Sequence, residues 1–308
     1  MATMSSQPSE PDGPFDMHYY LTEGLEDEEH QRYRDVHSFT SAIDLRTEKL
    51  RSGNADEYLT PYLVFSHVKQ QQLVTIQGAR DSNYKTLRFF YLRSLRALIV
   101  KIMPGEAHEL AIWEFGKVFD RKLVSVGMGN ALKSIGSTTY YGIEGQSQKE
   151  ADASFKPRGA RNWKSDWPTM ILECGVTQSP QCLKAVAHWW ADNSVGEVNI
   201  VLTFIVSETA RTIRIMYWET NTIPNPHVSQ ERPNPTIVRV AIENTIHIDA
   251  NSITTIREKG EVVPGGTLSL DFKKLFLRDP VQGAGEANID LNEEDLRTFY
   301  ERTWSDMD

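Results

Sequence analysis

The chain has 308 residues, 40% of them hydrophobic and 24% charged, with two cysteines and a formal net charge of −9. This length suffices for one large domain or two small ones around a buried core, and the composition is that of a globular protein. The cysteines, Cys174 and Cys182, form no CxxC pair, which argues against a disulfide scaffold or a structural zinc site.

The charge is unevenly distributed along the chain. Residues 1–30 carry −8 and residues 286–308 carry −6, which leaves +5 for residues 31–285. A basic body with acidic ends is compatible with a phosphate-containing ligand; acidic ends that only keep the protein soluble are the alternative. No apolar run reaches the ~20 residues of a membrane span, and no secretory signal is visible. We therefore expect an intracellular protein, cytoplasmic or nuclear, without a membrane partner.

The N-terminal part of the sequence divides into two segments. Residues 1–35 are rich in serine, proline and acids, which predicts a disordered acidic tail. Residues 36–96 are expected to form an N-terminal extension packed on the core. An apolar segment at 97–103, ended by a Pro-Gly pair, is then typical of a strand.

Helix and strand patterns alternate through the rest of the chain. Apolar residues at three- and four-residue steps over 107–118 predict an amphipathic helix. Strands are predicted at 138–143, 151–156 and 169–176, a helix over 180–193, and a strand buried on both faces at 198–206. Beyond them we predict an edge strand at 211–219, a proline-rich loop over 223–235, strands at 236–242, 245–249 and 267–272, a hairpin connection at 260–266, and a helix over 292–304. Residues 97–280 are thus expected to form an α/β (α+β) core domain, and 281–308 an acidic tail with a short helix.

Two acidic residues lie on neighbouring predicted strands. Because strand residues two apart share a face, Asp152 shares one with Lys156, and a suitable register would place its carboxylate beside that of Glu173. Glu173 stands in one of the most apolar stretches of the chain, where an unpaired carboxylate is costly. A Mg²⁺ ion shared by the two carboxylates would satisfy both. A buried Arg or Lys partner, or an exposed strand end, would explain Glu173 equally well.

The sequence around these acids resembles that of a group of uncharacterised fungal proteins. The similar stretches are EADASFKP at 150–157, WPTMILECG at 167–175, SPQCLK at 179–184 with Trp189-Trp190, His108-Glu109, and residues 268–277. That group is similar to the PD-(D/E)XK, restriction-endonuclease-like nuclease superfamily. The resemblance implies a mixed central sheet flanked by helices over residues 97–280, with an N-terminal extension and extra C-terminal strands.

The resemblance also implies a metal site. Asp152 and Glu173 would hold one or two Mg²⁺ or Mn²⁺ ions. The backbone carbonyl of Cys174 would be a further ligand, and Glu109 on the leading helix would be an additional acid.

The sequence departs from the pattern at three positions. Ala151 precedes Asp152 where a proline is usual, and Val186 stands where the fungal group tends to carry Asp. The lysine expected two residues after the glutamate is replaced by Gly175. Lys156 or Lys184 could supply the missing ammonium group, which orients water and neutralises phosphate charge. Ordinary surface lysines are the alternative for both.

A basic segment surrounds and separates the two acidic strands. Lys149, Arg158, Arg161 and Lys164 cluster around Trp163. Such side chains could grip a phosphate backbone while the indole stacks on a base. An ordinary solvated loop has the same composition.

The sequence therefore predicts a metal-dependent endo- or exonuclease that hydrolyses phosphodiester bonds of nucleic acid, DNA foremost, with a metal-activated water as nucleophile. The alternative is a catalytically inactive nuclease-like scaffold that binds nucleic acid or a protein partner. Retention of Asp152 and Glu173 favours the enzyme, and Gly175 favours the scaffold. A homodimer is compatible with either function.

Overall fold

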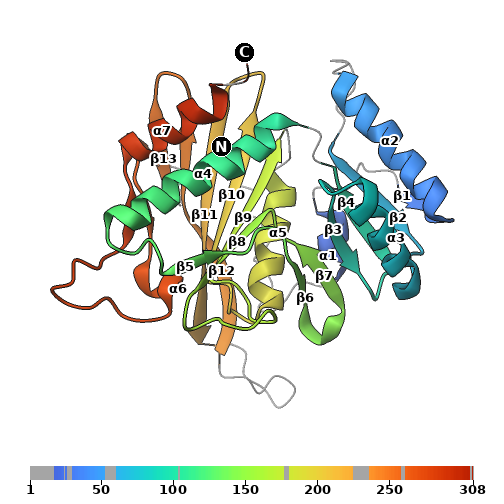
Figure 1. Cartoon of the computed structure of the whole chain (residues 1–308), viewed down its shortest axis with the longest axis horizontal. Coiled ribbons are helices and arrows are strands. Elements are labelled where there is room, and N and C mark those ends of the chain that lie inside the picture. Colours follow the sequence, from blue (N-terminus) through green and yellow to red (C-terminus); the bar gives the residue numbers. More distant parts are fainter. Residues whose placement is uncertain are drawn as a thin grey trace, which may run out of the picture.

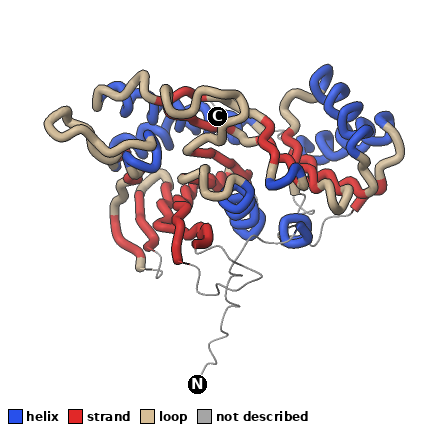
Figure 2. The backbone as a smooth tube through the Cα atoms, turned by 90° about the horizontal axis from the view of Figure 1, so that it is seen from below, coloured by secondary structure: helices blue, strands red, loops and turns tan. Residues whose placement is uncertain are grey.

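The computed structural model describes residues 17–23, 25, 30–52, 60–102, 105–176, 180–224, 236–257, 261–305 and 307. Two large sheets lie side by side, and the helix Pro180–Asn193 (α5) runs between them (Figures 1 and 2). No helix in the described ranges is long and apolar enough to span a membrane.

The first sheet has six strands. In spatial order they are β1 (His30–Arg32), β2 (Tyr62–Ser66), β4 (Ala97–Lys101), β3 (Arg88–Leu92), β7 (Ser147–Glu150) and β6 (Thr139–Tyr141). The helices α2 (Val36–Ser52) and α3 (Gln70–Asn83) pack apolar side chains such as Phe39 and Leu73 onto one face. The expected boundary between residues 96 and 97 falls between β3 and β4, which are hydrogen-bonded neighbours. The N-terminal extension and the core therefore share one sheet.

The second sheet has eight strands and is mixed. In spatial order they are β14 (Val262–Pro264), β13 (Ile253–Arg257), β12 (Thr236–Ile248), β11 (Thr212–Pro224), β10 (Ile200–Ser207), β9 (Met170–Val176), β8 (Ala153–Pro157) and β5 (Leu132–Ser134). Only the β9–β10 pair among them is parallel, and α5 makes the crossover between these two strands. The expected mixed sheet flanked by helices is confirmed.

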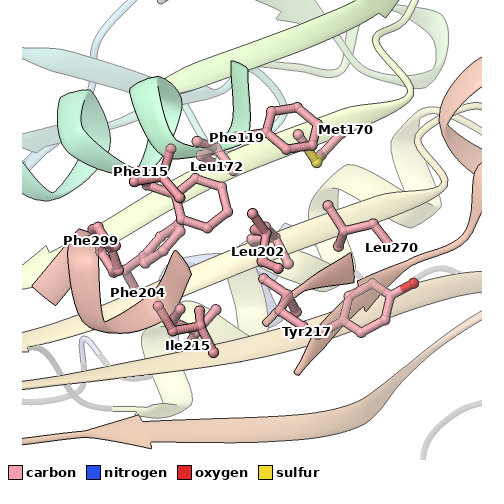
Figure 3. Close-up of a cluster of buried hydrophobic side chains, with 14 of the residues drawn as sticks. Phe115, Phe119, Met170, Leu172, Leu202, Phe204, Ile215, Tyr217, Leu270 and Phe299 are labelled. Atoms are coloured by element: carbon pink, nitrogen blue, oxygen red, sulfur yellow. The ribbon is translucent and has the colours of Figure 1, made fainter. Parts of the chain in front are cut away.

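One face of the second sheet packs against α4 (Glu106–Ser125) and α7 (Glu293–Trp304). Phe115 of α4, Phe204 of β10 and Phe299 of α7 touch one another at ring-centroid distances of 4.9 to 6.0 Å (Figure 3). Each such buried ring contributes roughly 1.5–3 kcal/mol of transfer free energy. The terminal helix predicted over 292–304 is confirmed, but it belongs to the core rather than to a tail. The short helix α6 (Phe272–Phe276) and the strand pair β15 (Leu268–Leu270) and β16 (Ile289–Leu291) complete this cluster.

The helix α5 is buried on all sides because a sheet lies on each side of it. The two adjacent tryptophans show this most directly, since both are fully buried. The indole of Trp189 donates a hydrogen bond to Ser147 in the first sheet, and the indole of Trp190 donates one to Glu173 in the second. The polar side chains His188 and Asp192 lie against the N-terminal segment, where His188 packs on Tyr19 and Asp192 accepts a hydrogen bond from Tyr20.

The N-terminal segment corrects one expectation. Residues Met17–Thr22 form a helix, α1, whose Tyr20 side chain is only 2% exposed. The Tyr20 hydroxyl donates a hydrogen bond of 2.7 Å to Asp192 of α5. The prediction of a disordered tail over residues 1–35 is therefore wrong for residues 17–23 and also for 30–35, where β1 pairs with β2. Residues 1–16, 24 and 26–29 lie outside the described ranges.

Most of the expected elements between 105 and 206 are present: α4, β6, β8, β9, α5 and β10. Two short strands in this region, β5 and β7, and a 3-10 turn at Ile143–Gly145 were not expected. The proline-rich loop falls largely outside the described residues, since only 223 and 224 are described and they end β11.

The unexpected strand β7 defines where the candidate site lies. It ends at Glu150 in the first sheet, and β8 begins at Ala153 in the second. The chain therefore crosses from one sheet to the other at Ala151 and Asp152.

Candidate functional site

Asp152 lies at the junction of the two sheets, and its carboxylate is 1% exposed. Its Oδ2 atom accepts a hydrogen bond of 2.6 Å from Lys101 Nζ and one of 2.8 Å from the Cys174 backbone N–H. His108 Nε2 of α4 lies 3.1 Å from the same oxygen. A carboxylate that is removed from water requires such partners to remain charged.

Lys101 is the central cation of this group. It ends β4, and its ammonium group also donates a hydrogen bond of 2.6 Å to the Cys174 carbonyl oxygen. Burial by itself would lower the pKa of Lys101, but the charges of Asp152 and Glu173 outweigh it and raise that pKa. Burial likewise opposes ionisation of Asp152, yet Lys101 and His108 hold the pKa of Asp152 well below its usual value. Lys101 and Asp152 are therefore both charged at neutral pH.

Arg88 explains why a carboxylate is needed at this position. In the β3–β4 pair, Arg88 lies directly opposite Lys101. Two cations in opposed strand positions repel each other. Asp152 lies within ion-pair distance of both, with its Oδ1 3.9 Å from Arg88 Nε and its Oδ2 2.6 Å from Lys101 Nζ.

Glu173 lies on the neighbouring strand and has its own cation. Its Oε1 atom accepts hydrogen bonds of 2.7 Å from Lys149 Nζ of β7 and from Trp190 Nε1 of α5. The Lys149 ammonium also lies 5.4 Å from the centre of the Trp190 ring. Glu173 is 2% exposed, so its charge is held by the protein rather than by water.

The expected pairing of the two acidic strands is confirmed. Ala153 of β8 lies opposite Leu172 of β9 in an antiparallel register. Asp152 immediately precedes Ala153 and Glu173 immediately follows Leu172, so the two acids flank the same end of the pairing. Each acid nevertheless binds a different lysine. We call these four residues, Lys101, Asp152, Lys149 and Glu173, the junction cluster.

The junction cluster does not fit the divalent ion that the sequence predicts. Asp152 Oδ2 and the Cys174 carbonyl, two of the expected ligands, both bind the Lys101 ammonium. The Oε1 atom of Glu173 binds Lys149. Among the described residues, no group of three or more His, Cys, Asp and Glu side chains is placed to hold a metal ion. An ammonium group thus lies where the ion was expected.

The other residues expected at the site lie elsewhere. Glu109 has a side chain that is 57% exposed, and its Oε1 lies 3.9 Å from His108 Nδ1. Lys156 is buried and donates hydrogen bonds of 3.3 Å to the carbonyl oxygens of Trp163 and Lys164. Lys184 is half-buried on α5. The lysine that reaches Asp152 is therefore Lys101, which the sequence did not single out.

The basic segment divides in two in the structure. Arg158, Lys164 and Trp163 are exposed, the last at 77%, while Arg161 is ion-paired with Glu197. Lys149 does not belong with them, because it is 6% exposed and bound to Glu173. Its expected role in nucleic-acid binding is therefore corrected to that of a buried ion-pair partner.

Among the described residues, the cavity that adjoins the junction cluster is small. It has a volume of about 30 Å³ and is lined by Lys101, Lys149 and Arg88. Tyr20 and Leu25 from the N-terminal segment also line it. A cavity of this volume holds one or two water molecules.

Burial also raises the pKa of Cys174 and Cys182, so neither thiol is a reactive nucleophile.

The comparisons with known proteins give little further information. No protein-family model matches the chain, and no curated protein matches it. One similar solved structure is that of a protein from Anabaena variabilis described as "a putative nuclease belonging to DUF820". It has 12% sequence identity and a TM-score of 0.31, and the match covers 49% of this chain and 75% of that chain. A similarity this low carries no argument about function.

Proposed function

We propose that this chain is a nuclease-like protein that binds nucleic acid without cleaving it, because the ammonium group of Lys101 replaces the metal ion of the site. One observation carries the proposal. Lys101 Nζ lies 2.6 Å from both Asp152 Oδ2 and the Cys174 carbonyl oxygen, the two groups expected to bind the metal. The element order around the two acids, α4, β8, β9, α5 and β10, supports the nuclease-like description.

An ammonium group cannot replace the chemistry of a divalent ion. A bound Mg²⁺ lowers the pKa of its water ligands and stabilises charge on the phosphoryl oxygens. The Lys101 ammonium donates hydrogen bonds to Asp152 and Cys174, and an ammonium group has no vacant coordination site at which it could bind a water and lower its pKa. The water-sized cavity beside it also gives a phosphodiester no access.

The nucleic-acid contact is assigned to the exposed part of the basic segment. Arg158 and Lys164 carry their charges into solvent, and Trp163 presents its indole there. Lysine and arginine neutralise backbone phosphates, and an exposed aromatic ring stacks on unpaired bases. Single-stranded nucleic acid is therefore the preferred ligand.

A metal-dependent nuclease remains the second candidate, and the strand register favours it. Asp152 and Glu173 flank the same end of the β8–β9 pairing, as two metal ligands would. This function requires that Lys101 leaves Asp152 when a metal ion binds. One experiment distinguishes binding without cleavage from metal-dependent cleavage.

The experiment measures binding and cleavage in parallel. Fluorescence anisotropy with labelled single- and double-stranded oligonucleotides compares the wild type with Trp163→Ala, Lys164→Ala and the control Arg257→Ala. Arg257 is also exposed, but it lies on β13 and pairs with Glu261. We expect about tenfold weaker binding for Trp163→Ala, from the loss of one stacked base, and no change for the control. Absence of binding by the wild type would contradict the proposal.

Cleavage is tested on the same oligonucleotides and on a plasmid with Mg²⁺ or Mn²⁺. We expect no product from the wild type. Product that disappears in Glu173→Gln would overturn the proposal and establish the metal-dependent nuclease.

A further inference from the structure

An open cleft lies beside the junction cluster, at the edge of the first sheet. Its volume is about 350 Å³, within the range of small-ligand sites. It is lined by Arg80, Asp81, Lys85, Leu87, Arg88, Ser137, Thr139 and Glu150. Seven of these eight side chains are polar or charged, which suits a polar anion and disfavours an apolar ligand.

Both carboxylates of the cleft bind the same guanidinium. Arg80 forms ion pairs with Asp81, at 2.8 Å, and with Glu150. Glu150 also accepts hydrogen bonds from the Phe89 backbone N–H at 3.1 Å and from the Thr139 hydroxyl at 3.1 Å. Arg80 therefore offsets one of these two negative charges, and with Lys85 and Arg88 included the charged side chains that line the cleft leave one positive charge in excess.

Two cations of the cleft, Lys85 and Arg88, make no ion pair with either of these acids. Lys85 is exposed, and none of the ion pairs between described residues includes it. Arg88 donates from Nη1 to the carbonyl oxygens of Lys85 and Leu87, at 3.2 and 3.4 Å. Its Nε is buried without a hydrogen-bond partner, and its one carboxylate contact, Asp152 Oδ1, is long at 3.9 Å. The buried Nε thus faces Asp152, and the hydrogen bonds of Arg88 to described residues come from Nη1, so Nη2 is left to donate to a phosphate oxygen.

We propose that this cleft binds the phosphate group of a nucleotide, with Lys85 and Arg88 as the cationic contacts and the Ser137 hydroxyl as a hydrogen-bond donor. The volume accommodates a phosphate together with its sugar. The nucleotide can be free or can be the terminal residue of a nucleic-acid strand. For the polymer, the inference rests on the proposed nucleic-acid binding; for the free nucleotide, it does not.

Arg88 connects this cleft to the junction cluster, since it lines both the cleft and the enclosed cavity. A phosphate in the cleft would share Arg88 with Asp152. The ligand therefore meets the cluster through a single guanidinium and does not enter it.

The test uses the full-length protein and four ligands. Isothermal titration calorimetry compares a nucleoside 5′-monophosphate with the same nucleoside, and an oligonucleotide with a 5′-phosphate with the same oligonucleotide with a 5′-hydroxyl. We expect each phosphorylated ligand to bind at least about tenfold more tightly than its counterpart, as for loss of one charged contact. Equal affinities within both pairs would overturn the inference.

Variants locate the effect. Lys85→Ala should abolish most of the preference for phosphate, and the control Lys49→Ala, which removes an exposed charge from α2 outside the cleft, should leave it unchanged. Arg88→Lys keeps the charge but loses the planar fork, and it should also weaken the preference, with circular dichroism to confirm the fold. A preference that survives Lys85→Ala and Arg88→Lys would contradict the assignment.

The outcome separates this inference from the proposed function. Oligonucleotide binding that depends on Trp163 but shows no phosphate preference would sink the inference and leave the proposed function intact. Monophosphate binding that depends on Lys85, without binding of any oligonucleotide, would sink the proposed function and support the inference.

Discussion

The junction cluster and the exposed basic segment contain similar residues but use them in opposite ways. Lys101 and Lys149 are 7% and 6% exposed, and each is hydrogen-bonded to a carboxylate. Arg158 and Lys164 extend into solvent. A charge enters the interior only with a partner, because its desolvation costs several kcal/mol. Lysines in the first region are therefore committed to the fold, and the cations of the second are available to a ligand.

The difference also bears on catalysis. A nuclease site requires carboxylates that are free to bind a metal ion. In the junction cluster both carboxylates are neutralised by lysines from other strands. Substitutions in the junction cluster should therefore reduce stability more than substitutions in the exposed basic segment.

Removing the Lys101 ammonium should be the most damaging change. Lys101→Met leaves Asp152 buried without its closest cation, and breaking a buried pair in this way costs about 3–5 kcal/mol. Urea denaturation should show this loss in the free energy of unfolding. The double variant Lys101→Met with Asp152→Asn should regain a large part of it. A single variant as stable as the wild type would mean that the pair is not charged.

The pH dependence of stability should show the same pair. Burial raises the pKa of Asp152, but Lys101 and His108 outweigh it and hold that pKa well below its usual value of 3.8. The contribution of Asp152 to stability is therefore present above pH 3.8 and is lost as pH falls through the folded-state pKa. The pKa of Lys101 is raised above 10.5, so its contribution is complete below that value and is lost as pH rises through the folded-state pKa.

The matched comparison is again with the Lys101→Met, Asp152→Asn double variant. The difference in unfolding free energy between it and the wild type should be constant from about pH 5 to about pH 9 and should change on either side. A difference that varies steadily across this range would contradict the assignment of charges.

Glu173→Gln should have an intermediate effect. The amide oxygen can still accept the hydrogen bonds from Lys149 and Trp190, but the buried Lys149 loses its counter-charge. We expect a loss of about 1–3 kcal/mol in the free energy of unfolding. A loss of less than about 0.5 kcal/mol in the free energy of unfolding, as for a substitution on the surface, would show that Lys149 has another partner.

Changes in the basic segment should hardly affect stability. Lys164→Ala should alter the free energy of unfolding by less than about 0.5 kcal/mol. It should nevertheless weaken nucleic-acid binding and reduce the slope of log affinity against log salt by about one, as for the loss of one phosphate contact. An unchanged slope would exclude Lys164 from the contact.

The sequence predicts the elements of the core better than the partners within it. β8, β9, α5 and β10 have strong local patterns, so their existence and the adjacency of the two acids could be predicted. The cations that pair with these two acids could not be predicted. Lys101 is 51 residues from Asp152 along the chain, and its contact depends on how the two sheets meet.

Short elements were the other source of error. β7 has only four residues, and it is this strand that carries Lys149 to Glu173. α1 is six residues long and lies in an acid-rich segment, so its apolar side chains gave too weak a pattern for a helix. One local signal was present for Lys101. A lysine at the end of a strand whose five residues are all buried requires a carboxylate partner.

Mn²⁺ binding tests directly whether Lys101 takes the position of the metal ion. Electron paramagnetic resonance of free Mn²⁺ is recorded while the wild type and the Asp152→Asn variant are titrated into it. The account predicts that the two proteins leave the same amount of Mn²⁺ free. One Mn²⁺ bound per wild-type chain, and lost in Asp152→Asn, would contradict it.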